Sequence, residues 1–205
     1  MEGGRGVPQV APKPDTTTGE PRPPRAPVLT TWKTEGKTNP ARAKFPPAPA
    51  GEGPLLEWYQ ATQSEAVKAG FALTALGVIF LCLLDWGFAW MATWWLWLCI
   101  VWPPIVFYFL GRSSGFSAGA DWFATSEKSY VRLYELKTVK LEYQAGGQSI
   151  GIELTDVHGG YAGAPLRQLQ RKRALWDLVY NGIAHSVLKG AATANEQALD
   201  KLELR

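Results

Sequence analysis

The chain has 205 residues, with 21 Lys or Arg against 18 Asp or Glu, so its formal net charge is a modest +3. The basic residues have no aromatic platform or recognition motif beside them, so we expect no nucleic-acid partner. Two cysteines, and a first fifty residues without an apolar core, argue against a secreted disulfide scaffold.

Residues 1–53 are rich in proline and poor in large apolar side chains, since eleven of the fifteen prolines precede residue 51. Such a composition predicts a disordered tail with polyproline-II character. Within it, Pro21, Pro24 and Arg25 form a PxxP run of the kind that an aromatic-lined groove binds. The alternative is a solvated linker.

Residues 54–111 are expected to hold an interfacial segment and two transmembrane helices. Trp58 and Tyr59 suit the headgroup region of a bilayer. The 41 residues that follow from Gly70 to Leu110 carry a single charge, Asp85, and are long enough for two spans of roughly 20 residues each. We therefore predict a membrane α-helical hairpin with helices at about 64–84 and 88–110 and a turn at 85–87.

The distribution of charge predicts how the hairpin is oriented. Eight Lys or Arg precede the first span, and none lies between Ala69 and Gly111. The positive-inside rule then places both termini in the cytoplasm, which makes this a multi-pass protein of the plasma membrane with the lipid bilayer as its first partner.

The two spans differ in character. Gly70 and Gly77, with several alanines, give the first span a small-residue surface for close approach to the second, or alternatively for a homo-oligomer contact. The second has six tryptophans within seventeen residues, which we interpret as an interfacial belt and packing bulk, with a tryptophan-lined ligand site as the alternative. Pro103 and Pro104 should kink it.

Residues 112–120 are expected to be a flexible linker. Gly115 to Gly119 match the G-x-S-x-G of a nucleophile elbow around Ser117, with Asp156, His158 and His185 downstream. The elbow requires a strand-to-helix turn over a large α/β sheet, for which too few residues remain. Neither histidine has metal-ligand spacing. We therefore expect no catalytic residue, no metal and no cofactor.

Residues 121–190 predict a small cytoplasmic α+β domain. Alternating apolar residues mark strands at 121–125, 130–136, 138–143 and 150–154, with turns at 145–147 and 156–160. An apolar stripe at helical spacing over 172–190 predicts a helix that caps the open face of the antiparallel sheet. Residues 191–205 are expected to be a frayed C-terminal tail.

This arrangement of sheet, capping helix and membrane hairpin resembles the pleckstrin-homology-like domains of bacterial membrane proteins. The segments 131–136 (VRLYEL) and 175–187 (LWDLVYNGIAHSV) are also similar to a group of uncharacterised actinobacterial two-span membrane proteins. That resemblance implies no known activity.

Four cations cluster just before the last helix, where they would oppose its macrodipole: Arg167, Arg171, Lys172 and Arg173. We interpret the cluster as a solvated helix start, with a site for anionic lipid headgroups or a phosphate-bearing partner as the alternative.

The sequence as a whole predicts a membrane-anchored, non-enzymatic interaction or scaffold protein that presents its domain at the inner leaflet and recruits protein partners. One alternative is a small subunit of a larger secretion, conjugation or transport complex that uses the Trp-rich second span as its binding face. The other is a hydrolase that uses Ser117.

Overall fold

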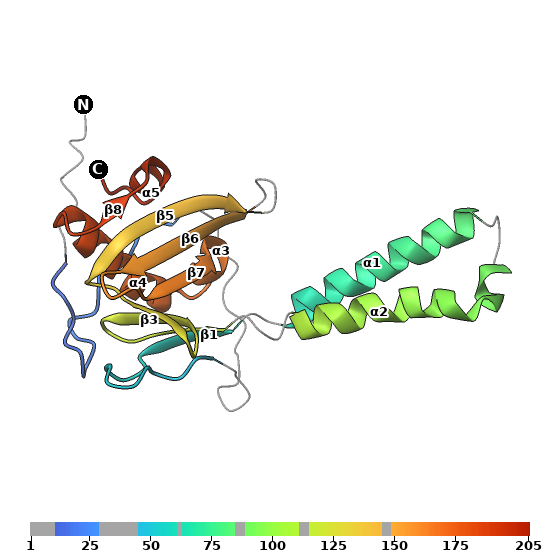
Figure 1. Ribbon diagram of the computed structural model, residues 1–205, viewed down its shortest axis with the longest axis horizontal. Helices are drawn as coiled ribbons and strands as arrows, with labels where there is room; N and C mark the ends of the chain where they lie inside the picture. Colours follow the sequence, from blue (N-terminus) through green and yellow to red (C-terminus); the bar gives the residue numbers. More distant parts are fainter. Residues whose placement is uncertain (1–10, 29–44, 61–62, 85–88, 111–114, 145–148) are drawn as a thin grey trace. The chain divides into compact units, whose positions relative to one another are not determined.

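The computed structural model describes residues 11–28, 45–60, 63–84, 89–110, 115–144 and 149–205, and it divides into two compact units (Figure 1). One unit is built from residues 1–60 and 115–205, and the other from 61–114. The apolar stretch is therefore an insertion in the sequence of a folded domain, with parts of that domain on both sides of it.

The first sheet of the domain joins the two sides of the insertion. Its strands are β1 (Glu57–Gln60), β2 (Gly115–Ala118), β3 (Trp122–Ser126) and β4 (Ser129–Arg132), paired antiparallel in the order β1-β2-β3-β4. Gln60 pairs with Gly115, so the insertion leaves and re-enters the domain at neighbouring strand positions.

Two predictions are wrong here. Tyr59 is buried against the ring of Phe116 within the domain, and Trp58 stacks on Phe45, so neither anchors an interfacial segment. Gly115 to Ala118 form a buried strand where the sequence predicted a linker. Each segment has four residues, too few to show a periodicity, and the two pair with each other across the insertion.

The second sheet contains β5 (Leu136–Gln144), β6 (Ser149–Asp156), β7 (Tyr161–Pro165) and β8 (Thr193–Ala194) in the order β7-β6-β5-β8. The alternation predicted at 138–143 and 150–154 is confirmed for its four central apolar residues, Val139, Leu141, Ile152 and Leu154, which are fully buried. At the far end of the hairpin Ile150 is half-buried and Tyr143 is 52% exposed. The predicted turn at 145–147 lies outside the described residues.

The predicted strand 130–136 is divided in two. Strand β4 ends at Arg132, and a turn in which the Glu135 N–H bonds to the Arg132 carbonyl leads into β5 at Leu136. This turn lets both Leu133 and Leu136 be fully buried, which a straight alternating strand would not allow. The chain thereby passes from the first sheet to the second.

Helix α4 (Arg173–Leu188) closes the domain and follows the short helix α3 (Leu166–Leu169). The helix predicted over 172–190 is confirmed, and it packs on strands of both sheets. Gly182 allows this, because a Cβ there would collide with Leu133, and the Ser186 hydroxyl donates to the Leu133 carbonyl at 2.9 Å.

The C-terminal residues are folded where a frayed tail was expected. They form β8 and helix α5 (Glu196–Lys201). The Asn195 side chain holds them to the sheet: it accepts from the Leu141 N–H at 3.1 Å, donates to the Leu141 carbonyl at 2.9 Å and caps α5 at Ala198. The Asn195 side chain therefore pairs with the main chain of β5 as a neighbouring strand would, and it also caps the N-terminus of α5.

The proline-rich segment is also partly folded. Residues 11–28 and 45–53 lie on the domain, and Ala26 is 3% exposed. The prediction of disorder over 1–53 is therefore wrong for these residues, because main-chain hydrogen bonds to domain side chains replace the apolar burial that the segment lacks. Residues 1–10 and 29–44 lie outside the described residues.

The inserted unit consists of α1 (Gln63–Leu84), the short 3-10 helix η2 (Ala89–Ala92) and α2 (Trp94–Leu110). Within the described ranges, one helix is long and apolar enough to cross a membrane, over Val67–Leu84. Helix α2 is equally apolar in character but has 17 residues. The predicted turn at 85–87 lies outside the described residues.

Candidate functional site

The surface of the inserted unit is its first candidate functional feature, because large apolar side chains cover it. Phe71, Leu76 and Leu83 on α1 are each at least 60% exposed, and Trp94, Trp102 and Phe109 on α2 are each more than 60% exposed. A soluble protein rarely exposes a continuous apolar surface of this kind. Such a surface is typical of a segment surrounded by lipid or by another apolar protein.

The contact between α1 and α2 is made by small residues, as predicted for Gly70. A Cβ on Gly70 would come within 2.8 Å of Pro104 Cα and 3.2 Å of the Pro103 carbonyl oxygen. Gly77 has nothing within 4 Å of its Cβ position, so it takes no part in this contact. One glycine, rather than both, sets the approach of the two helices.

A hydrogen bond crosses the same contact. Proline 104 has no N–H, so the carbonyl of Ile100, four residues earlier, lacks its usual helical partner. The Thr74 hydroxyl of α1 donates to that oxygen at 3.0 Å. In hydrocarbon an unpaired carbonyl costs several kcal/mol, and a threonine from a neighbouring helix is one of the groups that can replace the missing donor.

On the domain, residues 11–28 form a strap, a name we use for this segment throughout. Asp177 accepts from the Ala26 N–H at 2.9 Å, Arg173 donates to the Ala26 carbonyl at 2.8 Å, and the Trp176 indole donates to the Pro27 carbonyl at 2.9 Å. The predicted motif residues Pro21, Pro24 and Arg25 are exposed, beside this docked part of the strap.

The predicted cationic cluster does not form one surface. Lys172 lies 2.9 Å from Glu57 of β1 and over the ring of Trp58, and Arg173 is bonded to the strap. Arg167 is exposed on α3, and Arg171 is half-buried. Two of the four cations thus hold β1 and the strap to α4, which gives their position at a helix start a structural role.

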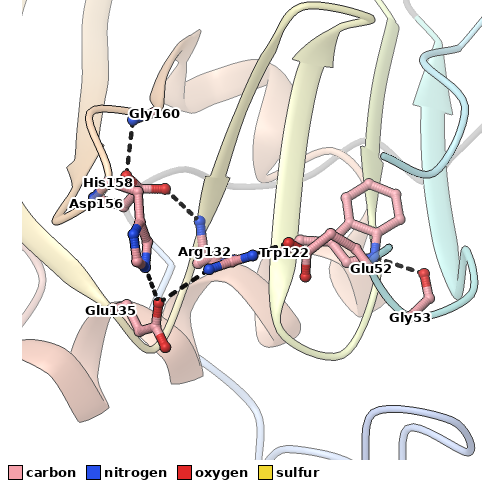
Figure 2. Close-up of polar contacts among 8 residues, drawn as sticks. All are labelled: Glu52, Gly53, Trp122, Arg132, Glu135, Asp156, His158 and Gly160. Carbon is pink, nitrogen blue, oxygen red and sulfur yellow. Dashed lines mark hydrogen bonds and ion pairs between the residues drawn. The ribbon is translucent and has the colours of Figure 1, made fainter. Parts of the chain in front are cut away.

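A second polar network, centred on Arg132, ties the N-terminal part of the domain to both sheets (Figure 2). The Arg132 Nε donates to Glu52 at 2.8 Å, and its Nη1 lies 3.7 Å from Glu135. Glu135 in turn lies 2.7 Å from His158 Nε2. His158 lies in the predicted turn, and its side chain is 55% exposed at the end of this chain of charges.

Asp156 is the buried member of the same region and is 3% exposed. Its Oδ2 accepts from the Arg132 N–H at 3.1 Å, and its Oδ1 accepts from the N–H groups of His158 at 2.9 Å and Gly160 at 2.8 Å (Figure 2). One carboxylate therefore joins the first sheet to the turn between β6 and β7. This arrangement stabilises the fold and leaves the carboxylate with no access to a substrate.

Ser117 does not lie on a nucleophile elbow. It is in strand β2 with its side chain fully buried, and its hydroxyl has no hydrogen-bond partner. A nucleophile must be exposed on a strand-to-helix turn, so this position does not meet the geometric requirement of the G-x-S-x-G motif. Within the described ranges, no three His, Cys, Asp or Glu side chains gather where they could hold a metal ion.

Several titratable groups lie where the strap meets α4 and the turn between β4 and β5. Burial raises the pKa of the Tyr134 hydroxyl to about 12. Burial, with the positive charges of Lys189 and Lys13, lowers the pKa of His185, whose ring stands edge-on to Tyr134 at 5.0 Å between centroids. Lys13 itself lies 5.0 Å above the Tyr134 ring.

The strap site was missed from the sequence, although a signal for it exists. Arg173, Asp177 and Asn181 recur at a spacing of four, which places them on one face of α4 beside its apolar stripe. Asn181 donates to Tyr134 Oη at 2.9 Å and reaches the Pro12 carbonyl at 3.5 Å. A regular polar stripe on a helix that caps a sheet indicates that the helix contacts a second segment in addition to the sheet.

Comparison of the chain with protein-family models, curated proteins and solved structures gives no match.

Proposed function

We propose that this protein is a membrane-anchored, non-enzymatic interaction module. In this proposal the α1–α2 hairpin crosses the plasma membrane twice, and the domain is presented at the cytoplasmic leaflet with both termini inside. The observation that supports it most directly is the inserted unit, whose exposed surface is apolar on both helices. The single charge of the stretch, Asp85, falls between the two helices, as a turn at the far interface requires.

Helix α2 has 17 residues, which is at the short end of the range for a transmembrane helix. Two features support its placement in the bilayer. Its aromatic residues begin at Trp94, where amphipathic rings favour the interface. The Ile100 carbonyl, which Pro104 leaves without a donor, is paired with the Thr74 hydroxyl, and this lowers the cost of placing that helix in hydrocarbon.

The double attachment supports a presenting role. Gln60 and Gly115 are paired neighbours in one sheet, and two and four residues (61–62 and 111–114) connect them to α1 and α2. Attachment through two adjacent strands restricts rotation of the domain more than a single linker would. A domain held this way suits a fixed docking surface.

The domain itself we propose to be pleckstrin-homology-like. Support comes from its chain order: four antiparallel strands, then three antiparallel strands, then a helix that packs on both sheets. This is more sheet than the sequence predicted, since β1, β2, β7 and β8 were not foreseen.

Topology labelling tests the main proposal. Cys82 and Cys99 are first replaced by Ala, and single cysteines are then introduced as Asp85→Cys and Lys128→Cys, the latter in the exposed β3–β4 turn. A membrane-impermeant maleimide should label position 85 in intact cells and position 128 only after permeabilisation. Labelling of position 128 in intact cells, or recovery of the protein from the cytosol without detergent, would contradict the proposal.

Contact with anionic lipid is proposed for the exposed side of α3 alone. Because Lys172 and Arg173 serve internal contacts, the informative variant is Arg167→Gln, compared with the control Lys137→Gln on the second sheet. Full-length protein in nanodiscs with and without phosphatidylserine should show a lipid-dependent change in domain mobility that the Arg167→Gln variant loses. An unchanged response in that variant would exclude this site.

A second candidate function is favoured by the tryptophans of α2. Trp94, Trp95 and Trp102 are 76%, 53% and 66% exposed, which is a large aromatic area for two helices to present to lipid. As a subunit of a larger membrane complex, the protein would use this area as its binding face. Extraction in mild detergent distinguishes the two: a subunit co-purifies with other membrane proteins, and the Trp94→Leu/Trp102→Leu variant loses them.

A further inference from the structure

The strap is held to the domain mainly through its main chain. The Ala26 N–H, the Ala26 carbonyl and the Pro27 carbonyl each bond to a domain side chain. Within residues 11–28 the buried positions are Pro14, Gly19 and Ala26, and most others are exposed. This is the pattern of a bound peptide, in which backbone groups give affinity and a few side chains fit the surface.

The surface beneath the strap has the features of a docking surface for extended, proline-containing peptides. Trp176 is fully buried and directs its indole N–H at the Pro27 carbonyl. Asp177 and Arg173 lie 3.4 Å apart and bond to the donor and the acceptor of the same strap residue, Ala26. Proline-rich ligands are read in this way, by aromatic side chains and by hydrogen bonds to their carbonyl groups.

The fit extends along the strap. Gly19 has a φ of +72°, a backbone conformation that favours glycine, and a Cβ there would meet the Leu56 side chain. Arg22 lies 3.3 Å from Glu57, next to the place where Lys172 contacts the same carboxylate. We name the surface formed by Glu57, Arg173, Trp176, Asp177 and Asn181 the strap groove.

We propose that the strap groove is a protein-docking site, and that its partner in trans is the strap of a second copy of this chain. The chain's own strap is seated on it in this structure, so the matching sequence is present on every copy. Sixteen residues, 29–44, separate the strap from Phe45, a reach of roughly 50 Å when extended. A strap can therefore occupy a neighbour's groove while it remains attached to its own domain.

A complementation experiment in mild detergent tests whether the strap of one copy occupies the groove of another. The first copy lacks residues 1–28, so its groove is empty. The second keeps its strap but carries Arg173→Ala and Asp177→Ala, so that it cannot hold the strap in cis. Differently tagged copies of the two kinds should co-isolate, about tenfold more than either kind with itself. Equal recovery in all three pairings would overturn the proposal.

Two strap substitutions supply the matched control. Ala26→Asp places a carboxylate against Asp177 of the empty groove and should abolish the co-isolation. Pro24→Asp adds the same charge at an exposed position and should leave it intact. Equal loss with both substitutions would show that charge alone drives the association, and the groove would be excluded.

A peptide measurement identifies the occupant. A labelled peptide of residues 11–28 should bind the first copy, and its Ala26→Asp form should bind about tenfold more weakly than its Pro24→Asp form. Peptide binding without co-isolation of the copies would exclude the second copy as the partner, and absence of peptide binding would exclude the groove. If the first copy fails to fold, the full-length Ala26→Asp variant, which retains the strap but cannot seat it, takes its place.

Discussion

The hydroxyl of Thr74 on α1 donates a hydrogen bond to the carbonyl of Ile100 on α2, the carbonyl that Pro104 leaves without a donor. The two helices are thereby joined at the one place where α2 is interrupted. Close approach at Gly70, one turn earlier on α1, brings the hydroxyl within reach. The hairpin therefore holds together through a packing contact and a polar contact that depend on each other.

Thr74→Val tests the hydrogen bond. It keeps the shape of the side chain and leaves the Ile100 carbonyl unpaired, so we expect a loss of about 0.5–2 kcal/mol in hairpin stability. Controlled unfolding in bicelles measures it. Pro104→Ala restores the helical N–H, so in that background Thr74→Val should cost little. If Thr74→Val lowers the stability of the hairpin equally with Pro104 and with Ala at position 104, the Thr74 hydroxyl does not replace the donor that Pro104 removes from the Ile100 carbonyl.

Gly70→Ala tests the packing contact. The added methyl group meets backbone atoms of Pro103 and Pro104, which cannot move aside as a flexible side chain would, so we expect a destabilisation of about 1–3 kcal/mol. Gly77→Ala has open space at its Cβ and should be neutral or slightly stabilising, since alanine has the higher helix propensity. The same bicelle measurement compares the two. A neutral Gly70→Ala would show that the helices are not in close contact there.

Asp156→Asn tests the carboxylate that joins the two sheets. An amide offers one oxygen and an NH₂ group to three N–H donors, so at least one donor loses its partner and the NH₂ faces another donor. We expect a loss of about 1–3 kcal/mol in the free energy of unfolding of the domain, measured by urea denaturation in detergent. Asp200→Asn, at an exposed ion pair with Arg205, should change it little.

Asp121→Asn gives a prediction with a defined pH dependence. Burial raises the pKa of Asp121, and its Oδ1 has no hydrogen-bond partner. The folded state therefore binds a proton more tightly than the unfolded chain does, so stability from this group is present below the unfolded pKa near 3.8 and is lost as pH rises through the folded pKa. The variant should be more stable than the parent protein at pH 7. At pH 3.5 this gain in stability should be smaller or absent. A gain independent of pH would contradict this account.

The sequence alone determined the features that depend on local pattern. Three features could be predicted because the apolar pattern within each segment indicates the environment of that segment. They are the apolar stretch, the alternation over 138–143 and 150–154, and the helical stripe of α4. The assignment of Gly70 to the helix contact is of the same kind. The prediction of two spans remains a prediction, since α1 alone has the required length among the described helices.

Only the tertiary structure decided the features that depend on distant partners. Strands β1 and β2 pair across a 54-residue insertion, and neither has enough residues to show alternation. The strap has a composition typical of disorder, and it is ordered through hydrogen bonds from α4, about 150 residues away. Lys172 and Arg173 formed a plausible lipid site in sequence and are engaged by Glu57 and Ala26 instead. The local sequence pattern indicates whether a residue is buried. It does not indicate which distant residue will contact it, because residues far apart in the sequence meet only in the folded chain.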